Sequence, residues 1–105
     1  MRRRLGNNDA LIADLIRMFL DIHPQQISAV ESAVSSGRTD QVRSSAHALK
    51  GCASNLSAVG VVDASAALER AAERGESGDF ERLFDRVREE MSLLVHELTA
   101  LHEEK

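Results

Sequence analysis

Apolar residues recur at alternating intervals of four and three positions through the last quarter of the chain, and this spacing constrains the fold more than any other feature. Residues three and four apart lie on the same face of an α-helix, so the segment that begins near Asp79 is predicted to be a helix with one apolar stripe. The stripe consists of Phe80, Phe84, Val87, Met91, Leu94, Leu98 and Leu101. A stripe of this length is stable only when other helices cover it, which predicts a helical bundle.

Two helices are predicted in the first third of the chain. The first covers residues 7–23 and is capped by one of the two asparagines at its start. Pro24 disfavours a helical conformation for the residue before it and suits the first position of a helix, so the second helix is predicted over residues 24–36. Gly37 closes that helix.

Two further helices are predicted before the last one. Thr39 is a suitable N-cap for a helix over residues 40–59, and Gly60 marks the break after it. A shorter helix follows over residues 61–74, and its charged stretch Glu69–Arg74 is interpreted as a solvated face with local ion pairs. Short loops make successive helices antiparallel neighbours. The sequence therefore predicts an all-α fold, an antiparallel up-down four-helix bundle with an additional N-terminal helix packed against one end or side.

The length of 105 residues predicts one domain over residues 7–105, preceded by a short tail, residues 1–6. The three aromatic residues are all Phe, so the core is expected to consist mainly of aliphatic side chains. The formal net charge of −4 argues against a nucleic acid as partner, because binding to phosphates needs a concentrated basic face. The basic run Arg2–Arg4 is too short for such a patch.

The sequence does not suggest a membrane protein, a secreted protein or a metal site. No apolar run approaches the roughly 20 residues that a membrane span needs, and the first residues lack the apolar stretch of a secretory signal. Cys52 is the only cysteine, and His23, His96 and His102 are not spaced as helical neighbours of one another or of this cysteine. We therefore expect a cytoplasmic monomer without a metal ion.

His47 lies on the polar side of the helix predicted over residues 40–59. With about 100° of rotation per residue, this helix places two sets of residues on opposite sides. The apolar side holds Val42, Leu49, Cys52, Ala53 and Leu56, and the polar side holds Arg43, Ser44, His47, Lys50, Gly51 and Ser54. The histidine is therefore expected to face away from the core, with a lysine and a glycine one turn further along the same face.

Lys50 and Gly51 give this histidine a chemical context. Glycine in a helix interior costs about 1 kcal/mol relative to alanine, and an exposed position offers no reason for that cost unless another surface must come close. Neutral imidazole is a competent nucleophile near pH 7. The Lys50 ammonium can neutralise part of an incoming phosphoryl group. Together His47, Lys50 and Gly51 are coherent as a phosphoryl-acceptor site.

The run from His47 to Gly51, followed by Ala53, Asn55 and Leu56, resembles the signature of the histidine-containing phosphotransfer (HPt) domains of multistep two-component signalling. Three further stretches resemble the layout of this family: Met18–Leu20 with Pro24, Gly37–Asp40, and Gly78–Phe80. The resemblance thus covers nearly the whole chain. It implies that His47 is the phosphorylated residue and that a lysine one turn away, Lys50, stabilises the phosphohistidine. It also implies that Gly51 leaves room for a receiver domain to dock.

The resemblance also implies a set of partners. Such a domain accepts a phosphoryl group from the aspartyl phosphate of a response-regulator receiver domain, which can belong to a hybrid histidine kinase, and passes it to another receiver without autonomous kinase activity. Docking is expected on Arg43, Ser44 and Ser54. No cofactor is expected on this chain, and Mg²⁺ is expected on the receiver. Cys52 stands where many family members carry serine, and we interpret it as a small packing residue.

Two alternative functions stay open at this point. The dimerisation and phosphoacceptor domain of a sensor kinase also presents a histidine on a helix, typically with an acidic residue directly after it and a proline a few positions later. Here Ala48 follows the histidine and Cys52 lies in that neighbourhood. A non-catalytic adaptor bundle, in which His47 is incidental, predicts that the histidine, Lys50 and Gly51 can be replaced without loss of phosphoryl flow.

Overall fold

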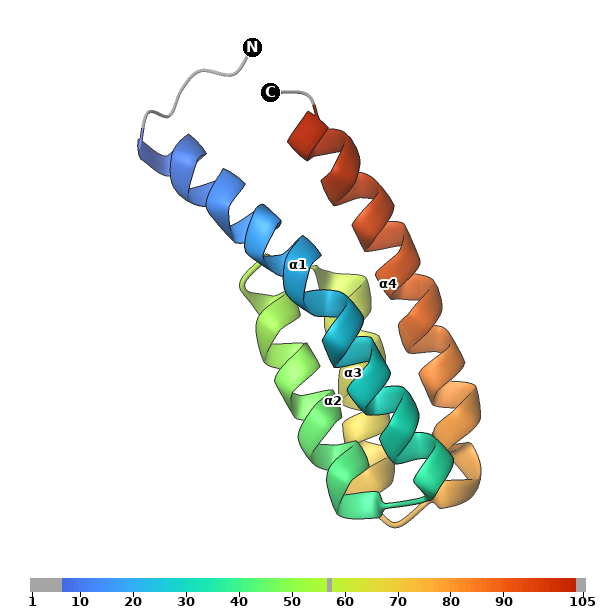
Figure 1. Ribbon diagram of the computed structural model, residues 1–105. Coiled ribbons are helices and arrows are strands. Elements are labelled where there is room, and N and C mark those ends of the chain that lie inside the picture. Colours follow the sequence, from blue (N-terminus) through green and yellow to red (C-terminus); the bar gives the residue numbers. More distant parts are fainter. Residues whose placement is uncertain (1–6, 57, 104–105) are drawn as a thin grey trace.

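The computed structural model describes residues 7–56 and 58–103, and these residues form helices and no strand. The elements are α1 (Asn7–Ser36), α2 (Thr39–Ser54), α3 (Val59–Glu73), the 3₁₀ turn η1 (Ser77–Asp79) and α4 (Phe80–Glu103), drawn in Figure 1. The all-α prediction is therefore confirmed. The predicted tail, residues 1–6, and the side chain of His102 lie outside the described part of the chain.

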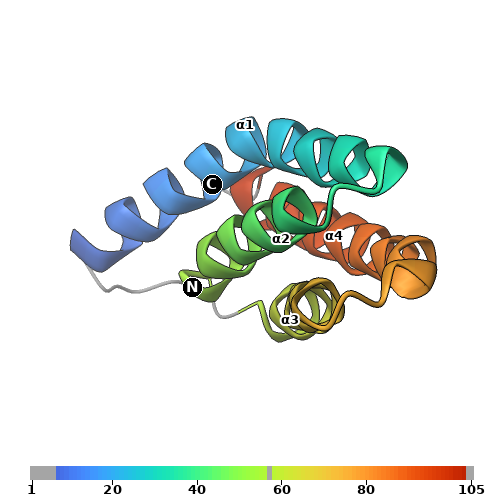
Figure 2. The ribbon, with the colours of Figure 1, turned by 90° about the horizontal axis from the view of Figure 1, so that it is seen from below.

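The four helices form a bundle in which each helix contacts two neighbours. α1 contacts α2 and α4, and α3 contacts the same two helices. Successive helices run in opposite directions (Figure 1), and Figure 2 shows α2 and α4 between α1 and α3. α1 and α4, with 30 and 24 residues, are longer than α2 and α3, with 16 and 15. The two long helices therefore extend beyond the short pair at the end that holds both chain termini (Figure 1).

The core lies where the apolar stripes of the four helices meet. Its fully buried hydrophobic side chains include Val30 from α1, Val42 and Leu49 from α2, Val61 and Leu68 from α3, and Phe80 and Val87 from α4. The predicted stripe of α4 is buried as far as Leu98, apart from the half-buried Leu94, whereas Leu101 near the extended end is 53% exposed. Within the described residues, no helix is long and apolar enough to cross a membrane.

The prediction of two helices before Gly37 is wrong, because α1 continues through Pro24. Proline inside a helix removes one backbone hydrogen bond and crowds the preceding turn, at a cost of about 3 kcal/mol. The apolar spacing, however, stays in phase across it: Phe19 before the proline and Val30 after it are both buried in one core. Burial of this continuous stripe outweighs the local cost. The additional N-terminal helix is therefore the first half of α1.

We expect Pro24→Ala to stabilise the protein by about 2 kcal/mol. The change restores a backbone donor inside α1, and the less restricted unfolded chain offsets part of the gain. The measurement is urea unfolding followed by circular dichroism. The control is Gln25→Ala, at the exposed neighbouring position, which should change stability by less than about 0.5 kcal/mol. A destabilised Pro24→Ala protein would show that the packing of the proline ring contributes more than the missing hydrogen bond costs.

The helix that carries His47 is shorter than the predicted span over residues 40–59. α2 begins at Thr39, so Arg38 and not the predicted threonine occupies the N-cap position, and no side chain caps the helix there. It ends at Ser54, where the amide of Asn55 donates to the carbonyl of Cys52 at 3.3 Å. The helix therefore ends five residues before the predicted boundary, and α3 already begins at Val59.

Gly60 is not the break that the sequence predicted, because it lies in the first turn of α3. A Cβ atom at this position would collide with the Glu90 side chain, which extends over the glycine from α4. The clashing atoms are the far end of a flexible side chain, so the glycine accommodates the present position of Glu90 and a shift of that side chain would make room for a Cβ atom. The turn that the sequence assigned to Gly37 is confirmed, since this residue has a φ of +68°, a conformation that L side chains rarely adopt.

Candidate functional site

His47 projects from the middle of α2 on the side away from the core. The buried residues of this helix are Val42, Ala46, Leu49 and Ala53, at the spacing of a single helical face. The side chain of His47 is 67% exposed. The expectation that it faces solvent is therefore confirmed, and a second protein can reach the imidazole.

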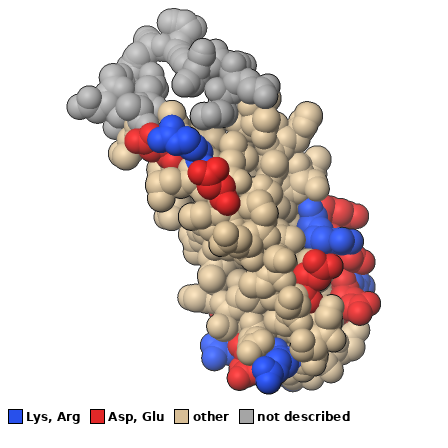
Figure 3. All heavy atoms as spheres, viewed as in Figure 1, with Lys and Arg blue, Asp and Glu red and all other residues tan. Residues whose placement is uncertain are grey.

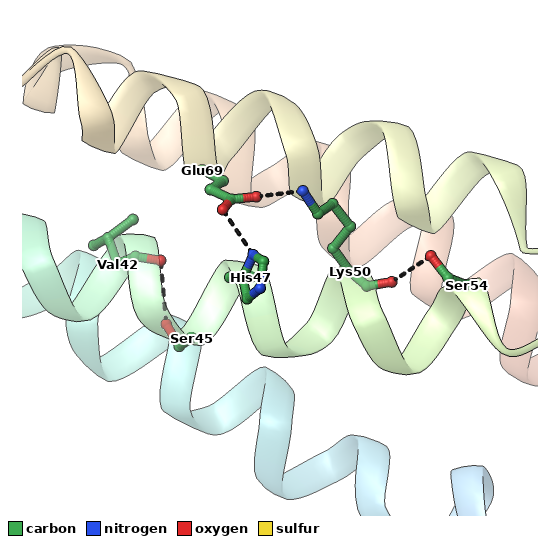
Figure 4. Close-up of polar contacts among 6 residues, drawn as sticks. All are labelled: Val42, Ser45, His47, Lys50, Ser54 and Glu69. Carbon is green, nitrogen blue, oxygen red and sulfur yellow. Dashed lines mark hydrogen bonds and ion pairs between the residues drawn. The ribbon is translucent and has the colours of Figure 1, made fainter.

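Glu69 from α3 joins His47 and Lys50 into one polar cluster, shown in Figure 4. Nδ1 of His47 lies 2.8 Å from Oε2 of Glu69, and Nζ of Lys50 lies 2.7 Å from Oε1 of the same carboxylate. The Glu69 side chain is only 9% exposed, and that of Lys50 is 31% exposed. One nearly buried carboxylate thus holds the histidine with one oxygen and the lysine with the other.

The interpretation of Glu69 as part of a solvated face is wrong. Its contacts cross from α3 to α2, to residues 22 and 19 positions earlier in the chain, whereas the expected ion pairs were local. Two neighbours on the same helix face, Ser65 and Ala72, are buried with it. Glu69 comes four residues after Ser65 and three before Ala72, so it shares a helix face with them. This spacing is the one signal in the sequence that could have placed Glu69 at the edge of the core.

The electrostatics of the cluster favour an ionised Glu69 carboxylate, and this carboxylate defines which ring nitrogen of His47 carries the hydrogen. Burial raises the pKa of Glu69, but hydrogen bonds from Lys50 and His47 and the charges of these partners lower it, and the net pKa lies below the ordinary value of 4.5. An ionised carboxylate can only accept hydrogen bonds, so Nδ1 of His47 carries the hydrogen and donates it. Nε2 is then the nitrogen with the free lone pair.

Gly51 is exposed on the same face of α2, one turn after His47. A Cβ atom added here would meet no atom within 4 Å outside the adjacent backbone. Packing within the chain therefore gives no reason for glycine at this position. Because Gly51 has no side chain, no atoms protrude from the helix surface beside the imidazole.

The other residues that the sequence assigned to this face surround the cluster. Arg43 and Ser44 are exposed one turn before His47, and the exposed Ser54 donates its hydroxyl to the carbonyl of Lys50 at 3.0 Å. Cys52 is half-buried at the border of the core, and its burial raises the pKa of the thiol despite a hydrogen bond from Gln26. A raised pKa disfavours the reactive thiolate.

His23 and His96 are not part of the Glu69 cluster. The predicted end of a helix at residue 23 would put His23 at a helix junction, but His23 lies inside α1 and stacks on the ring of Phe19 at 5.8 Å between centroids. His96 lines a groove between α1 and α4. Among the described residues, no group of three or more His, Cys, Asp or Glu side chains could hold a metal ion.

Comparison with known proteins agrees with this geometry. The family model of the Hpt domain matches residues 14–103, which is most of the chain. None of the curated proteins compared with the sequence matches it. Among solved structures, the chain is similar to the crystal structure of histidine-containing phosphotransfer protein B (HptB) from Pseudomonas aeruginosa PAO1. The TM-score is 0.85 at 22% sequence identity, over 89% of this chain and 81% of that one. That likeness shows a shared fold, and the domain match confirms the resemblance found in the sequence: the chain belongs to the Hpt domain family.

Proposed function

We propose that this protein is a phosphorelay intermediate that accepts a phosphoryl group on Nε2 of His47 from a receiver-domain aspartyl phosphate and passes it to the aspartate of another receiver. Membership of the Hpt domain family supports histidine phosphotransfer. The observation that carries the proposal is the Glu69 carboxylate on Nδ1, at 2.8 Å, which leaves the other nitrogen of an exposed ring as the nucleophile.

The transfer follows from the charges of the cluster. The lone pair of Nε2 attacks phosphorus in line with the acyl oxygen of the aspartyl phosphate, the N–P bond forms, and the aspartate leaves as a carboxylate. Lys50 lies one turn from the ring and its side chain is 31% exposed, so its ammonium can turn toward the new phosphoryl oxygens. This chain would need no cofactor, and the Mg²⁺ that neutralises the transferring group would belong to the receiver.

A receiver would dock on the part of α2 around Gly51, where no side chain protrudes. Arg43, Ser44 and Ser54 would lie at the edges of this docking surface. The neighbouring part of α1 would extend it, because Met18 and Ile22 are 54% and 39% exposed there. They line a shallow apolar groove together with Cys52, Asn55 and others. Figure 3 shows the face on which α1 lies in front, where charged side chains gather toward the ends and one edge and few lie in the middle.

We further propose that the chain acts as a cytoplasmic monomer, with a hybrid histidine kinase as one source of the donor receiver. The site supports a monomer, because α2 and α3 of one chain supply His47, Lys50 and Glu69. A single chain therefore presents the nucleophile, its hydrogen-bond acceptor and the nearby cation.

Incubation with a set of radiolabelled phosphorylated receiver domains tests the proposal. We expect at least one receiver to transfer its label to this chain within minutes, as a phosphate that is labile in acid and stable in base, and fragmentation mass spectrometry should place it on His47. An adaptor bundle would bind without taking up label. Label on another residue would contradict the assignment, and labelling from ATP alone would favour a sensor-kinase domain.

A further inference from the structure

Glu69 contacts the ring nitrogen that does not receive the phosphoryl group, and this contact bears on the second half of the relay. Both oxygens of this carboxylate are engaged, Oε2 by Nδ1 of His47 and Oε1 by Nζ of Lys50. A side chain that is 9% exposed has little water to replace either partner. The inference rests on the proposed phosphorylation of His47 at Nε2.

The proton on Nδ1 decides how easily the phosphoryl group leaves. Attack by the neutral ring creates an imidazolium that carries phosphorus on Nε2 and hydrogen on Nδ1. In the onward step the N–P bond breaks, its electron pair returns to Nε2, and a P–O bond forms to the accepting aspartate. With the Nδ1 proton in place the leaving group is neutral imidazole, whereas without it the leaving group is an imidazolate anion, which is far more basic.

We infer that Glu69 is a positioning residue that holds the Nδ1 proton on His47 after phosphorylation and so keeps the phosphohistidine in its transferable form at neutral pH. The carboxylate lies 2.8 Å from Nδ1, which is the distance of a charge-assisted hydrogen bond. Its low exposure weakens solvent screening of the attraction between its negative charge and the positive ring.

The contacts of Lys50 are consistent with this role. Before transfer, the Lys50 ammonium neutralises Glu69. After transfer, the phosphoryl oxygens compete for the lysine, and the ring cation takes its place beside the carboxylate. The nearly buried carboxylate is thus paired with a cation in both states, which avoids the cost of an unpaired buried charge. The next charged residues along the two helices, Arg43 on α2 and Arg70 and Glu73 on α3, are exposed to solvent.

The test compares wild type with Glu69→Gln after both are phosphorylated by phosphoramidate, a donor that needs no receiver. Glutamine keeps one oxygen that accepts the Nδ1 hydrogen, removes the negative charge, and puts an amide NH2 in place of the oxygen that contacts Lys50. We expect the pH midpoint of the phosphohistidine, followed by ³¹P nuclear magnetic resonance, to fall by at least ~1 unit in the variant. At about pH 8, onward transfer to a receiver should slow by ~10-fold, because the protonated fraction falls in that proportion.

The matched control is Glu73→Gln, which removes an exposed carboxylate one turn further along α3 and should leave the midpoint unchanged. Wild type alone supplies a second measurement, since the midpoint should be at least ~1 unit higher in the folded phosphoprotein than in urea. Equal midpoints in wild type and Glu69→Gln, or in folded and unfolded wild type, would overturn the inference and leave the phosphotransfer function intact. Failure of wild type to accept phosphate from phosphoramidate and from every receiver would overturn both.

Discussion

The His47→Gln protein is expected to take up no detectable phosphate from any phosphorylated receiver, a loss of at least ~1,000-fold in transfer rate. An amide nitrogen has no available lone pair, so no side-chain atom at this position can attack phosphorus. The fold should be retained, because the replaced side chain is 67% exposed and contributes little to the core. Its unfolding free energy should fall by about 1 kcal/mol, because the hydrogen bond from the ring to Glu69 is lost. The measurement is label transfer in an alkaline gel, with thermal unfolding alongside.

The control for this variant is His96→Gln, which removes an exposed histidine of α4 that makes no contact with the Glu69 cluster. This protein should accept phosphate at the wild-type rate. Equal labelling of His47→Gln and wild type would refute the assignment of the phosphoacceptor. Loss of label in both variants would instead point to a general effect of histidine removal.

The position of the histidine could be predicted because it depends on local geometry. A helix rotates by a fixed angle per residue, so the spacing of Val42, Leu49 and Ala53 already determines that His47 lies opposite the core. The apolar stripe of α4 was predictable for the same reason. Pro24 was different, because local preference and tertiary packing disagree there. The cost of proline within α1 is smaller than the gain from burying one continuous helix against two neighbours.

Glu69 could not be assigned from the sequence, because its role depends on which helices lie side by side. Within its own charged stretch, local ion pairs one turn apart are the simplest interpretation. Packing of α3 against α2 instead places the carboxylate between His47 and Lys50 and nearly buries it. From the sequence, His47 and Lys50 could be predicted as nucleophile and cation, because both lie on one face of one helix. The carboxylate that accepts the hydrogen of Nδ1 belongs to a residue 22 positions after His47, on another helix.

Gly51→Gln is expected to slow phosphoryl transfer from a receiver by about 100-fold while raising the stability of the protein. Glutamine is a better helix former than glycine, so α2 should gain about 0.5 kcal/mol or more. The new side chain meets nothing within the protein, since even its Cβ lies in open space. It therefore extends over the surface beside His47 and keeps the two reacting atoms apart, and an error of about 1 Å in such an alignment can cost ~100-fold in rate. The transfer rate would be measured in reactions stopped at successive times, and the free energy of unfolding would be measured in urea.

A small phosphodonor separates docking from chemistry in this variant. Phosphoramidate needs no protein surface, and Gly51→Gln leaves His47, Lys50 and Glu69 in place, so uptake from phosphoramidate should stay within about threefold of wild type. Gly51→Ala provides a graded control, because a single methyl group should gain similar helix stability with a much smaller loss of transfer. Transfer from a receiver to Gly51→Gln at the wild-type rate would show that no partner approaches this part of α2. An equal loss with phosphoramidate would mean that the glutamine disturbs the nucleophile and not the docking surface.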